Sequence, residues 1–495
     1  MAHTIHKFLN GLTLISLIII ALFAVLMFRD LYHFRKNGTY TVDLPSITGY
    51  ASKYSFDPDE QIDLFIHADK PAKAKLYRLG EELVPFDVAF EVEPQPQSPQ
   101  FSRYKGMGWN KTHQLSASDF PAGVYVLEIT TGEDEADAES FRIPFVVKPE
   151  APPKIALVLS THTWDAYNAF GGASNYSNQQ FSAPVNAVVK VFKKLFGEPH
   201  LLQDHLPYAR PNQLISEDLA GLTDPYGVYN SRFIRNEWSM IAFLEKHGYD
   251  FAVYVDEDME PNGAAYSSDV LLLAGHMEYW TGGMIYGFDR YVARGGKVLA
   301  SAAGKPLAEP VQLRAHGKGF PSEHFPASWT ASRLGAAFTL MDMFSAAPFE
   351  VVEPDHWVFS GASLQEGDIF GEESLFVPEA WIDFWARYNY PTGGQGASGL
   401  YMSKVTAGSE DFQILAQGLN AEGGAHMVYR DTPAGGWIFS SSSETFNGAL
   451  SKDPVIALIV RNLLDRKPGS GGTGTTDKRE LPKPATEHKQ GALGG

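Results

Sequence analysis

Short runs in which apolar and polar residues alternate recur through the first third of the chain. Residues 62–66, 74–77 and 124–129 alternate in this way and are separated by turns rich in Pro, Gly and Asp. A period of two is typical of strands with one buried face, so residues 40–149 predict a small, Ig-like β-sandwich. This module could be a spacer without chemistry of its own. The proline-rich stretch at 148–154 is a plausible boundary with the region that follows.

The next region, residues 154–467, alternates between strand and helix patterns. Continuous apolar runs fit strands covered on both faces, and apolar residues spaced by three and four fit helices with one buried face. The strands are expected at 155–160, 249–255, 269–274 and 297–301, and the helices at 233–247 and 284–294. This order predicts an α/β fold with a doubly wound, mostly parallel sheet.

An uncharged apolar run occupies residues 8–28, and its 21 positions are enough to cross roughly 30 Å of hydrocarbon as a helix. The sequence therefore predicts a single-pass transmembrane anchor within residues 1–36 and a membrane location. A cleaved signal peptide is the alternative, but its apolar region is usually about 7–15 residues and ends at a small-residue cleavage site. The basic residues Lys7, Arg29, Arg35 and Lys36 specify the orientation only weakly, so the side of the soluble body stays open.

Composition narrows the function classes. Hydrophobic residues make up 44% of the chain, which is enough for sizeable cores, and 58 acidic residues against 40 basic ones argue against a nucleic-acid partner. The absence of cysteine excludes thiolate zinc sites, iron–sulfur clusters and enzymes with a cysteine nucleophile, class I amidotransferases among them. Residues 468–495 have almost no large apolar side chains and predict a disordered tail.

Polar side chains follow two of the predicted parallel strands. The strand at 269–274 leads into His276 and Glu278, which are two positions apart and point the same way on an extended backbone. The strand at 155–160 leads into a loop that carries Tyr167. Because ligands bind beyond the carboxyl ends of such strands, these residues predict an active site. The alternative is a hydrogen-bonded structural pair.

A second acidic group, at Asp256, Asp258 and Glu260, has the alternating carboxylates of a calcium loop. Gly263 is misplaced for the turn of such a loop, so we expect a solvated acidic surface loop without a metal.

Several separated motifs, in order, resemble the large (beta) subunit of N,N-dimethylformamidase and its relatives. The resemblance covers residues 154–467 and the opening of the sandwich at 49–58. The motifs are Thr163-Trp-Asp-Ala-Tyr-Asn168, Gly275-His-Met-Glu-Tyr-Trp280, Asp355-His-Trp-Val-Phe-Ser-Gly361, Gly367-Asp-Ile-Phe-Gly371, Gly435-Gly-Trp-Ile-Phe-Ser440, Asn447-Gly-Ala-Leu450 and the Asn462-Leu-Leu segment.

The resemblance implies an α/β core like that of class I amidotransferases beside β-sandwich modules, and a mononuclear iron held by two tyrosines and one glutamate. Carried over by motif, Glu278 is the carboxylate ligand and Tyr167 the first phenolate. Tyr208 is the choice for the second phenolate, with Tyr176 as the alternative. Two phenolates and one carboxylate are hard anionic donors that together neutralise Fe(III).

The resemblance also implies a hydrolase that cleaves the C–N bond of a small amide. His276 would pass a proton to the leaving amine or orient Glu278. The substrate-side motifs depart from the family, because Ser301-Ala-Ala-Gly304 replaces a Gly-x-Asn pattern and Gly399–Ser403 lacks the acids of a Gly-x-Glu-x-Asp stretch. Glu444 is the candidate to supply the missing catalytic acid, although an exposed loop glutamate is the competing interpretation.

Two hypotheses follow. The first is a membrane-anchored, iron-dependent hydrolase for a small, formamide-like amide. The second is a non-catalytic relative that binds a ligand or partner through an altered pocket. For either one, the resemblance suggests a small helper subunit, and a homo-oligomer stays open.

Overall fold

A computed structural model describes residues 21–22, 24–26, 39–102, 105–132, 138–168, 170–171, 209–212, 232–302, 327–338, 344–375, 392–400 and 402–466. Three of the predictions above fall outside these residues: the tail at 468–495 and the alternative second ligands Tyr208 and Tyr176.

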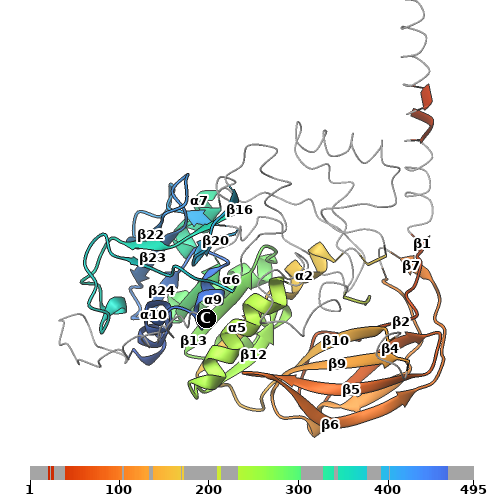
Figure 1. The fold of residues 1–495 in the computed structure, drawn as a ribbon. Helices are drawn as coiled ribbons and strands as arrows, with labels where there is room; N and C mark the ends of the chain where they lie inside the picture. The colour runs from red at the N-terminus through yellow and green to blue at the C-terminus, as the bar shows by residue number, and fades with distance from the viewer. Residues whose placement is uncertain are drawn as a thin grey trace, which may run out of the picture.

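Eight of the ten described strands of the first third form two sheets that enclose one core, and β1 and β7 pair with each other apart from these sheets. Alternation along them buries one side chain in two, as in Ile62, Leu64 and Ile66, which are not exposed at all. One sheet has the order β3-β10-β9-β5-β6 and the other the order β2-β4-β8. The strands are β1 (Thr39–Thr41), β2 (Ile47–Ala51), β3 (Ser55–Phe56), β4 (Gln61–Ala68), β5 (Ala72–Leu79), β6 (Leu83–Val92), β7 (Gln100–Ser102), β8 (His113–Ser116), β9 (Gly123–Thr131) and β10 (Ser140–Val147). Figure 1 shows them in orange as one lobe of the molecule.

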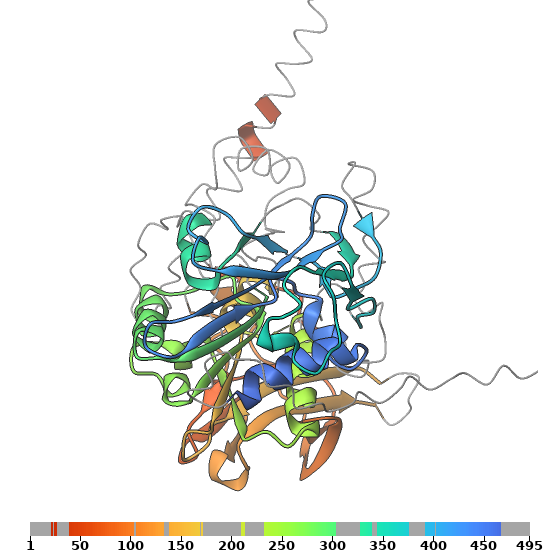
Figure 2. The same ribbon diagram turned by 90° about the vertical axis from the view of Figure 1, so that its left-hand side faces the viewer.

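The second lobe is built on a nine-stranded sheet of order β12-β11-β13-β14-β24-β23-β22-β17-β18. Its strands and helices are β11 (Ile155–Leu159), α2 (Thr161–Tyr167), α5 (Arg232–Lys246), β12 (Phe251–Val255), β13 (Val270–His276), α6 (Gly282–Ala293), β14 (Lys297–Ala302), α7 (Ala327–Leu334), β17 (Phe349–Val351), β18 (Ile369–Phe370), β22 (Gln413–Gly418), β23 (His426–Asp431), β24 (Trp437–Ser440), α9 (Phe446–Ala449) and α10 (Pro454–Asp465). The short strands β15 (Ala337–Phe338), β16 (Phe344–Ala347), β19 (Thr392–Gly393), β20 (Ser398–Gly399) and β21 (Ser403–Lys404) pair in two smaller sheets. Figure 2 shows the large sheet from the side, in green and blue.

The six strands and helices predicted between residues 155 and 302 are confirmed, with ends shifted by a few residues. Side chains of β11 alternate between the two faces of the sheet. Leu157 packs with the α5 side chains Trp238 and Ile241, and Val158 packs with Met284 of α6 on the opposite face. Continuous apolar strands are therefore the correct pattern for this part of the sheet.

The predicted fold class is nevertheless wrong. The nine-stranded sheet is mixed: the pairings from β12 to β24 are parallel, whereas those from β24 to β18 are antiparallel. The described residues are rich in β-strands, and the sheet is not the mostly parallel, doubly wound sheet of an amidotransferase-like fold. The physical reason is loop length. Residues 419–425 and 432–436 join β22, β23 and β24, and such short connections permit only antiparallel neighbours.

The predicted membrane anchor and membrane location are not supported. Among the residues that the structure describes, no helix combines the length and the apolar character needed to cross a bilayer. Of the apolar run at 8–28, only residues 21–22 and 24–26 are described. The segment boundaries 1–36, 40–149, 154–467 and 468–495 stay predictions.

Candidate active site

The carboxyl ends of the five parallel strands meet at one edge of the large sheet and carry a concentration of buried polar side chains. Ser160 follows β11, Asp256 follows β12, and His276 ends β13. Ser301 lies at the end of β14, and residues 441–445 follow β24. All these side chains are at most 2% exposed. The sheet geometry thus gathers polar groups from distant parts of the sequence at one place.

Helix α2 carries Tyr167 to this edge. The helix begins directly after Ser160, and the carboxylate of Asp256 accepts a hydrogen bond of 2.7 Å from the backbone N–H of His162 in its first turn. A carboxyl oxygen at this position is favourable because the first N–H groups of a helix have no partner within it. A second bond, of 2.9 Å, runs from the N–H of Glu278 to the hydroxyl of Thr163. Helix α2 is therefore fixed to both β12 and the segment after β13.

Tyr167 and Glu278 meet at the end of these two segments. The Tyr167 hydroxyl donates a hydrogen bond of 3.0 Å to Oε2 of Glu278, and Nε2 of His276 lies 3.4 Å from the same oxygen. His276 is 1% exposed and Glu278 7%, so the contact is shielded from bulk water. The structure thus brings together three of the residues that the sequence proposes for the site.

The donor set at this contact suits a hard cation. A phenol oxygen and a carboxylate oxygen converge there from two different segments, and both are oxygen donors. Within the described part of the chain, this contact included, no three His, Asp or Glu side chains form a group that could hold a metal ion. The role of Tyr167 and Glu278 as metal ligands stays a prediction, as does the identity of the second tyrosine.

Glu444 lies in the buried part of the same edge. Glu444 is only 2% exposed, so the interpretation as an exposed loop glutamate is wrong. Its backbone N–H donates to the carbonyl of Leu400, in the segment where the family resemblance places an acid. Leu400 and Ser442 have φ angles of 48° and 58°, which cost energy for residues with a side chain. Such strain is frequent at functional sites.

The acidic group at residues 256–260 is not a solvated loop either. Asp256 is 1% exposed and Asp258 is 8% exposed. Asp258 accepts hydrogen bonds from the Ser55 hydroxyl and from the Lys148 ammonium, both in the first lobe. Burial raises the pKa of Asp256 well above its usual range and that of Glu257 to about 7. These carboxyl groups fix α2 and join the two lobes.

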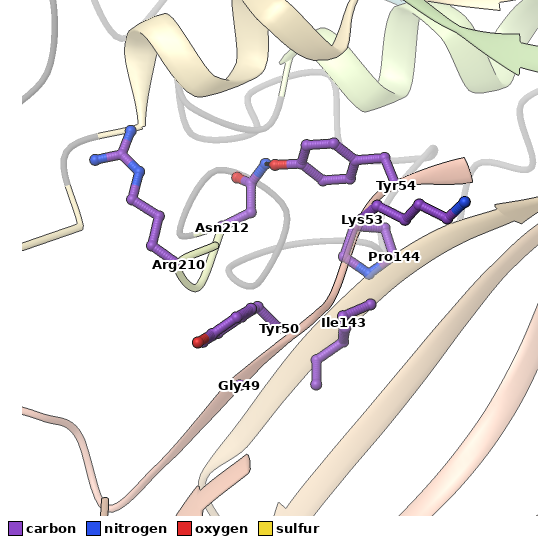
Figure 3. Close-up of a pocket in the computed structure, with 9 residues that line it drawn as sticks. Gly49, Tyr50, Lys53, Tyr54, Ile143, Pro144, Arg210 and Asn212 are labelled. Carbon is purple, nitrogen blue, oxygen red and sulfur yellow. Dashed lines mark hydrogen bonds between the residues drawn. The ribbon is translucent and has the colours of Figure 1, made fainter. Parts of the chain in front are cut away.

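A polar cluster on the other side of α2 was not predicted. Tyr54, next to β3, donates a 2.8 Å hydrogen bond to Asp165, and Asn212 donates one of 3.0 Å to the Tyr54 hydroxyl. Arg210 donates to the backbone carbonyl of Asp165. Figure 3 shows Tyr54 reaching from the first lobe toward Asn212, beside a small pocket that Arg210 also lines. This pocket does not include Tyr167 or Glu278, so it is separate from the site.

Sequence reasoning missed how three residues position the site, although it named Asp256 as part of an acidic loop. Thr163, Asp256 and Glu237 all bond to backbone groups of segments distant from them in the chain. Two of the three could have been found from their positions in the sequence. Thr163 lies within a family motif, and Asp256 directly follows a predicted strand.

Comparison with known proteins identifies the family. A family model described as N,N-dimethylformamidase beta subunit-like, C-terminal, matches residues 75–309 and 312–457, which is most of the chain. This match confirms the resemblance found in the sequence. No curated protein matches the chain. A crystal structure of the periplasmic chaperone SfaE aligns with 22% of this chain at 11% identity and a TM-score of 0.15. This chain spans 65% of that chaperone's length, and so weak a likeness carries no argument.

Proposed function

Because this chain belongs to the N,N-dimethylformamidase beta subunit-like family, we propose that it is a hydrolase that cleaves the C–N bond of a small, formamide-like amide. The observation that supports the proposal is the contact between Tyr167 and Glu278 at 3.0 Å, beside His276. This contact joins two family motifs beyond the carboxyl ends of the parallel strands, which is where such sheets bind their ligands.

Tyr167 and Glu278 fit a mononuclear Fe(III), since both offer hard oxygen donors and they already lie within hydrogen-bonding distance. A third donor would come from Tyr208 or Tyr176. Bound iron would supply Lewis acidity toward the amide carbonyl and would acidify a water molecule.

The side chains of the protein supply the proton transfers. In the reaction, the oxygen of water bonds to the carbonyl carbon, the C–N bond breaks, and the amine leaves with an added proton. His276 stands 3.4 Å from Glu278, where it can orient this carboxylate and donate a proton to the amine. Glu444, from the loop after β24, is the candidate to replace the missing catalytic acid: it takes the proton of the attacking water and then holds that proton as the acid.

At one neighbouring position, Ser301, the chain departs from the Gly-x-Asn pattern of the family. The Ser301 hydroxyl donates to the backbone carbonyls of Leu273 and Ala274, so it joins β14 to β13. A side chain bonded in this way is not directed at a substrate. The family takes its name from a beta subunit. This name supports the proposal that the chain works together with a second kind of subunit. A homo-oligomer is the alternative.

The test is the release of amine from a panel of formamide, N-methylformamide, N,N-dimethylformamide and the matching acetamides. We expect the iron-loaded protein to release amine from at least one member, and the Glu278→Ala variant to release none above background. Iron binding without release from any member would favour the non-catalytic, ligand-binding alternative. Equal release by both proteins would show that Glu278 is not part of the site.

A further inference from the structure

The side chain of Asn236, on helix α5, has no hydrogen-bond partner for either of its two polar atoms among the residues that the structure describes. The residue is 1% exposed, so bulk water cannot supply these bonds. A buried amide group without partners destabilises the folded chain, because it has given up its bonds to water and gained none. A cost of this kind is typical of residues that serve binding or catalysis.

Asn236 lies at the same edge of the large sheet as the candidate site. Its backbone carbonyl accepts a hydrogen bond of 3.2 Å from Nδ2 of Asn447, and the same Nδ2 donates one of 2.6 Å to the carbonyl of Ala274. Ala274 lies two positions before the last residue of β13, at the carboxyl end of the strand. In addition, the next residue of α5, Glu237, accepts a 2.7 Å bond from the backbone N–H of Ser160, directly after β11. Asn236 is thus held at the ends of the two strands that lead into the site.

Asn447 presents a second polar atom of the same kind. This residue belongs to α9 and is completely buried, and its Oδ1 has no partner within the described part of the chain. Because its other amide atom bonds to two carbonyl oxygens, which can only accept, that atom is the nitrogen and the unpaired atom is the oxygen. We call Asn236 and Asn447 the asparagine pair. It offers two acceptors, Oδ1 of each residue, and one donor group, Nδ2 of Asn236.

This set of groups is complementary to a primary amide. A primary amide, R–CO–NH2, has two N–H donors and one carbonyl acceptor, whereas the asparagine pair has two acceptors and one donor group. A secondary amide has one N–H donor and would leave one acceptor unpaired. A tertiary amide, such as N,N-dimethylformamide, has no N–H donor and would leave both acceptors unpaired. A buried site made for hydrogen bonds discriminates strongly against a ligand that cannot form them.

We propose that the asparagine pair binds the –CONH2 group of the substrate, so that the substrates of this chain are small primary amides and the leaving amine is ammonia. This inference rests on the proposed function and adds the substrate class to it. In the balanced reaction, R–CO–NH2 and water give R–COOH and ammonia. The water oxygen bonds to the carbonyl carbon, the C–N bond breaks with its electron pair going to nitrogen, and one proton of the water ends on that nitrogen. The asparagine pair holds the amide and exchanges no proton.

The binding of three amides that differ only in N-methylation tests the inference independently of turnover. The probes are acetamide, N-methylacetamide and N,N-dimethylacetamide, and ligand-observed NMR with the full chain gives their dissociation constants. We expect acetamide to bind about tenfold more tightly than N-methylacetamide, since one hydrogen bond is lost, and N,N-dimethylacetamide to bind more weakly still. Equal binding of the three amides would show that the asparagine pair holds only water, and would overturn the proposal.

The Asn236→Leu variant assigns this preference to one side chain. Leu has nearly the same shape as Asn but has no polar atoms, and the acceptor of Asn447 remains. We therefore expect acetamide and N-methylacetamide to bind the variant equally, while N,N-dimethylacetamide still binds more weakly. Because the Asn236 side chain has no bonds to lose, the melting temperature should stay the same or rise. An unchanged preference for acetamide in the variant would overturn the role of Asn236.

Asn420 provides the matched control for stability. It is also a buried asparagine, at 7% exposed, but its side chain is bonded to Ser345 and Ser398. Asn420→Leu should therefore lower the melting temperature, because its serine partners lose their bonds. An equal fall of the melting temperature in Asn236→Leu would show that Asn236 serves the fold, and would contradict the proposal.

Turnover distinguishes this inference from the proposed function. We expect kcat/KM for formamide to exceed that for N,N-dimethylformamide, with ammonia as the product. Faster hydrolysis of N,N-dimethylformamide would overturn the inference and leave the proposed function intact. The expected order of binding without hydrolysis of any amide would contradict the proposed function alone, and would support the asparagine pair as the binding site of a non-catalytic relative.

Discussion

Replacing Glu278 by Ala, or Tyr167 by Phe, is expected to lower the iron affinity of the protein by roughly 100-fold or more, because even groups one shell away from a metal contribute about 10–100-fold. The two side chains meet at 3.0 Å and supply two of the three expected donors. Tyr167→Phe removes only a hydroxyl and keeps the ring that packs against Ala166 and Tyr279. Iron per protein after dialysis, measured by atomic emission, checks the expectation.

The fold should survive both changes. The backbone N–H of Glu278 still bonds to Thr163, and helix α2 keeps the Asp256 carboxylate at its first turn. Circular dichroism should therefore match the wild type. Glu350→Gln, an exposed glutamate on β17, is the control that should retain iron. Retention of iron by both site variants would show that the ligands are other residues.

Replacing Glu444 by Gln is expected to lower kcat by about 10²–10⁴-fold, the usual contribution of a general acid or base, while bound iron is kept. Glu444 is buried at the edge where Tyr167 and Glu278 meet, in a loop whose Ser442 has a strained φ of 58°. Gln preserves the shape of the side chain but cannot accept or release a proton. Amine release at saturating substrate, together with iron content, checks this expectation.

The control for Glu444→Gln is the same substitution at Glu372, an exposed position outside the site. Glu372→Gln should leave kcat within twofold of the wild type. Loss of iron in Glu444→Gln would mean that Glu444 supports the metal instead of the proton transfer. Unchanged kcat would remove Glu444 from the mechanism.

The local patterns of the sequence predict the strands and helices between residues 155 and 302, because each is a continuous or periodic apolar segment. They do not predict the sheet as a whole. β22, β23 and β24 form the antiparallel half through hairpins, and the decisive feature is the length of the loops at 419–425 and 432–436. The parallel strands and the antiparallel strands belong to one sheet because β14 pairs with β24. Local patterns cannot show this pairing, and so they cannot show that the sheet is mixed.

In the candidate site, too, one part could be predicted from the sequence and another could not. Tyr167, His276 and Glu278 could be proposed because strand ends and family motifs identify them, and the structure brings them together. The groups that position these three residues could not be predicted, because each of those groups bonds to a partner far away in the sequence. Ser160 and Glu237 are 77 positions apart, and Tyr54 and Asp165 are 111 apart. The burial of Glu444 likewise depends on long-range packing, here against Leu400, which a loop-like sequence does not reveal.

The central claim is that Tyr167 and Glu278 bind one ferric ion together, and the visible absorption spectrum of the purified, iron-loaded protein tests it most directly. Coordination of a phenolate to Fe(III) produces a charge-transfer band in the visible range, and carboxylate ligands alone do not. The account predicts a coloured protein with about one iron per chain. A colourless protein, whether it contains iron or not, would contradict it.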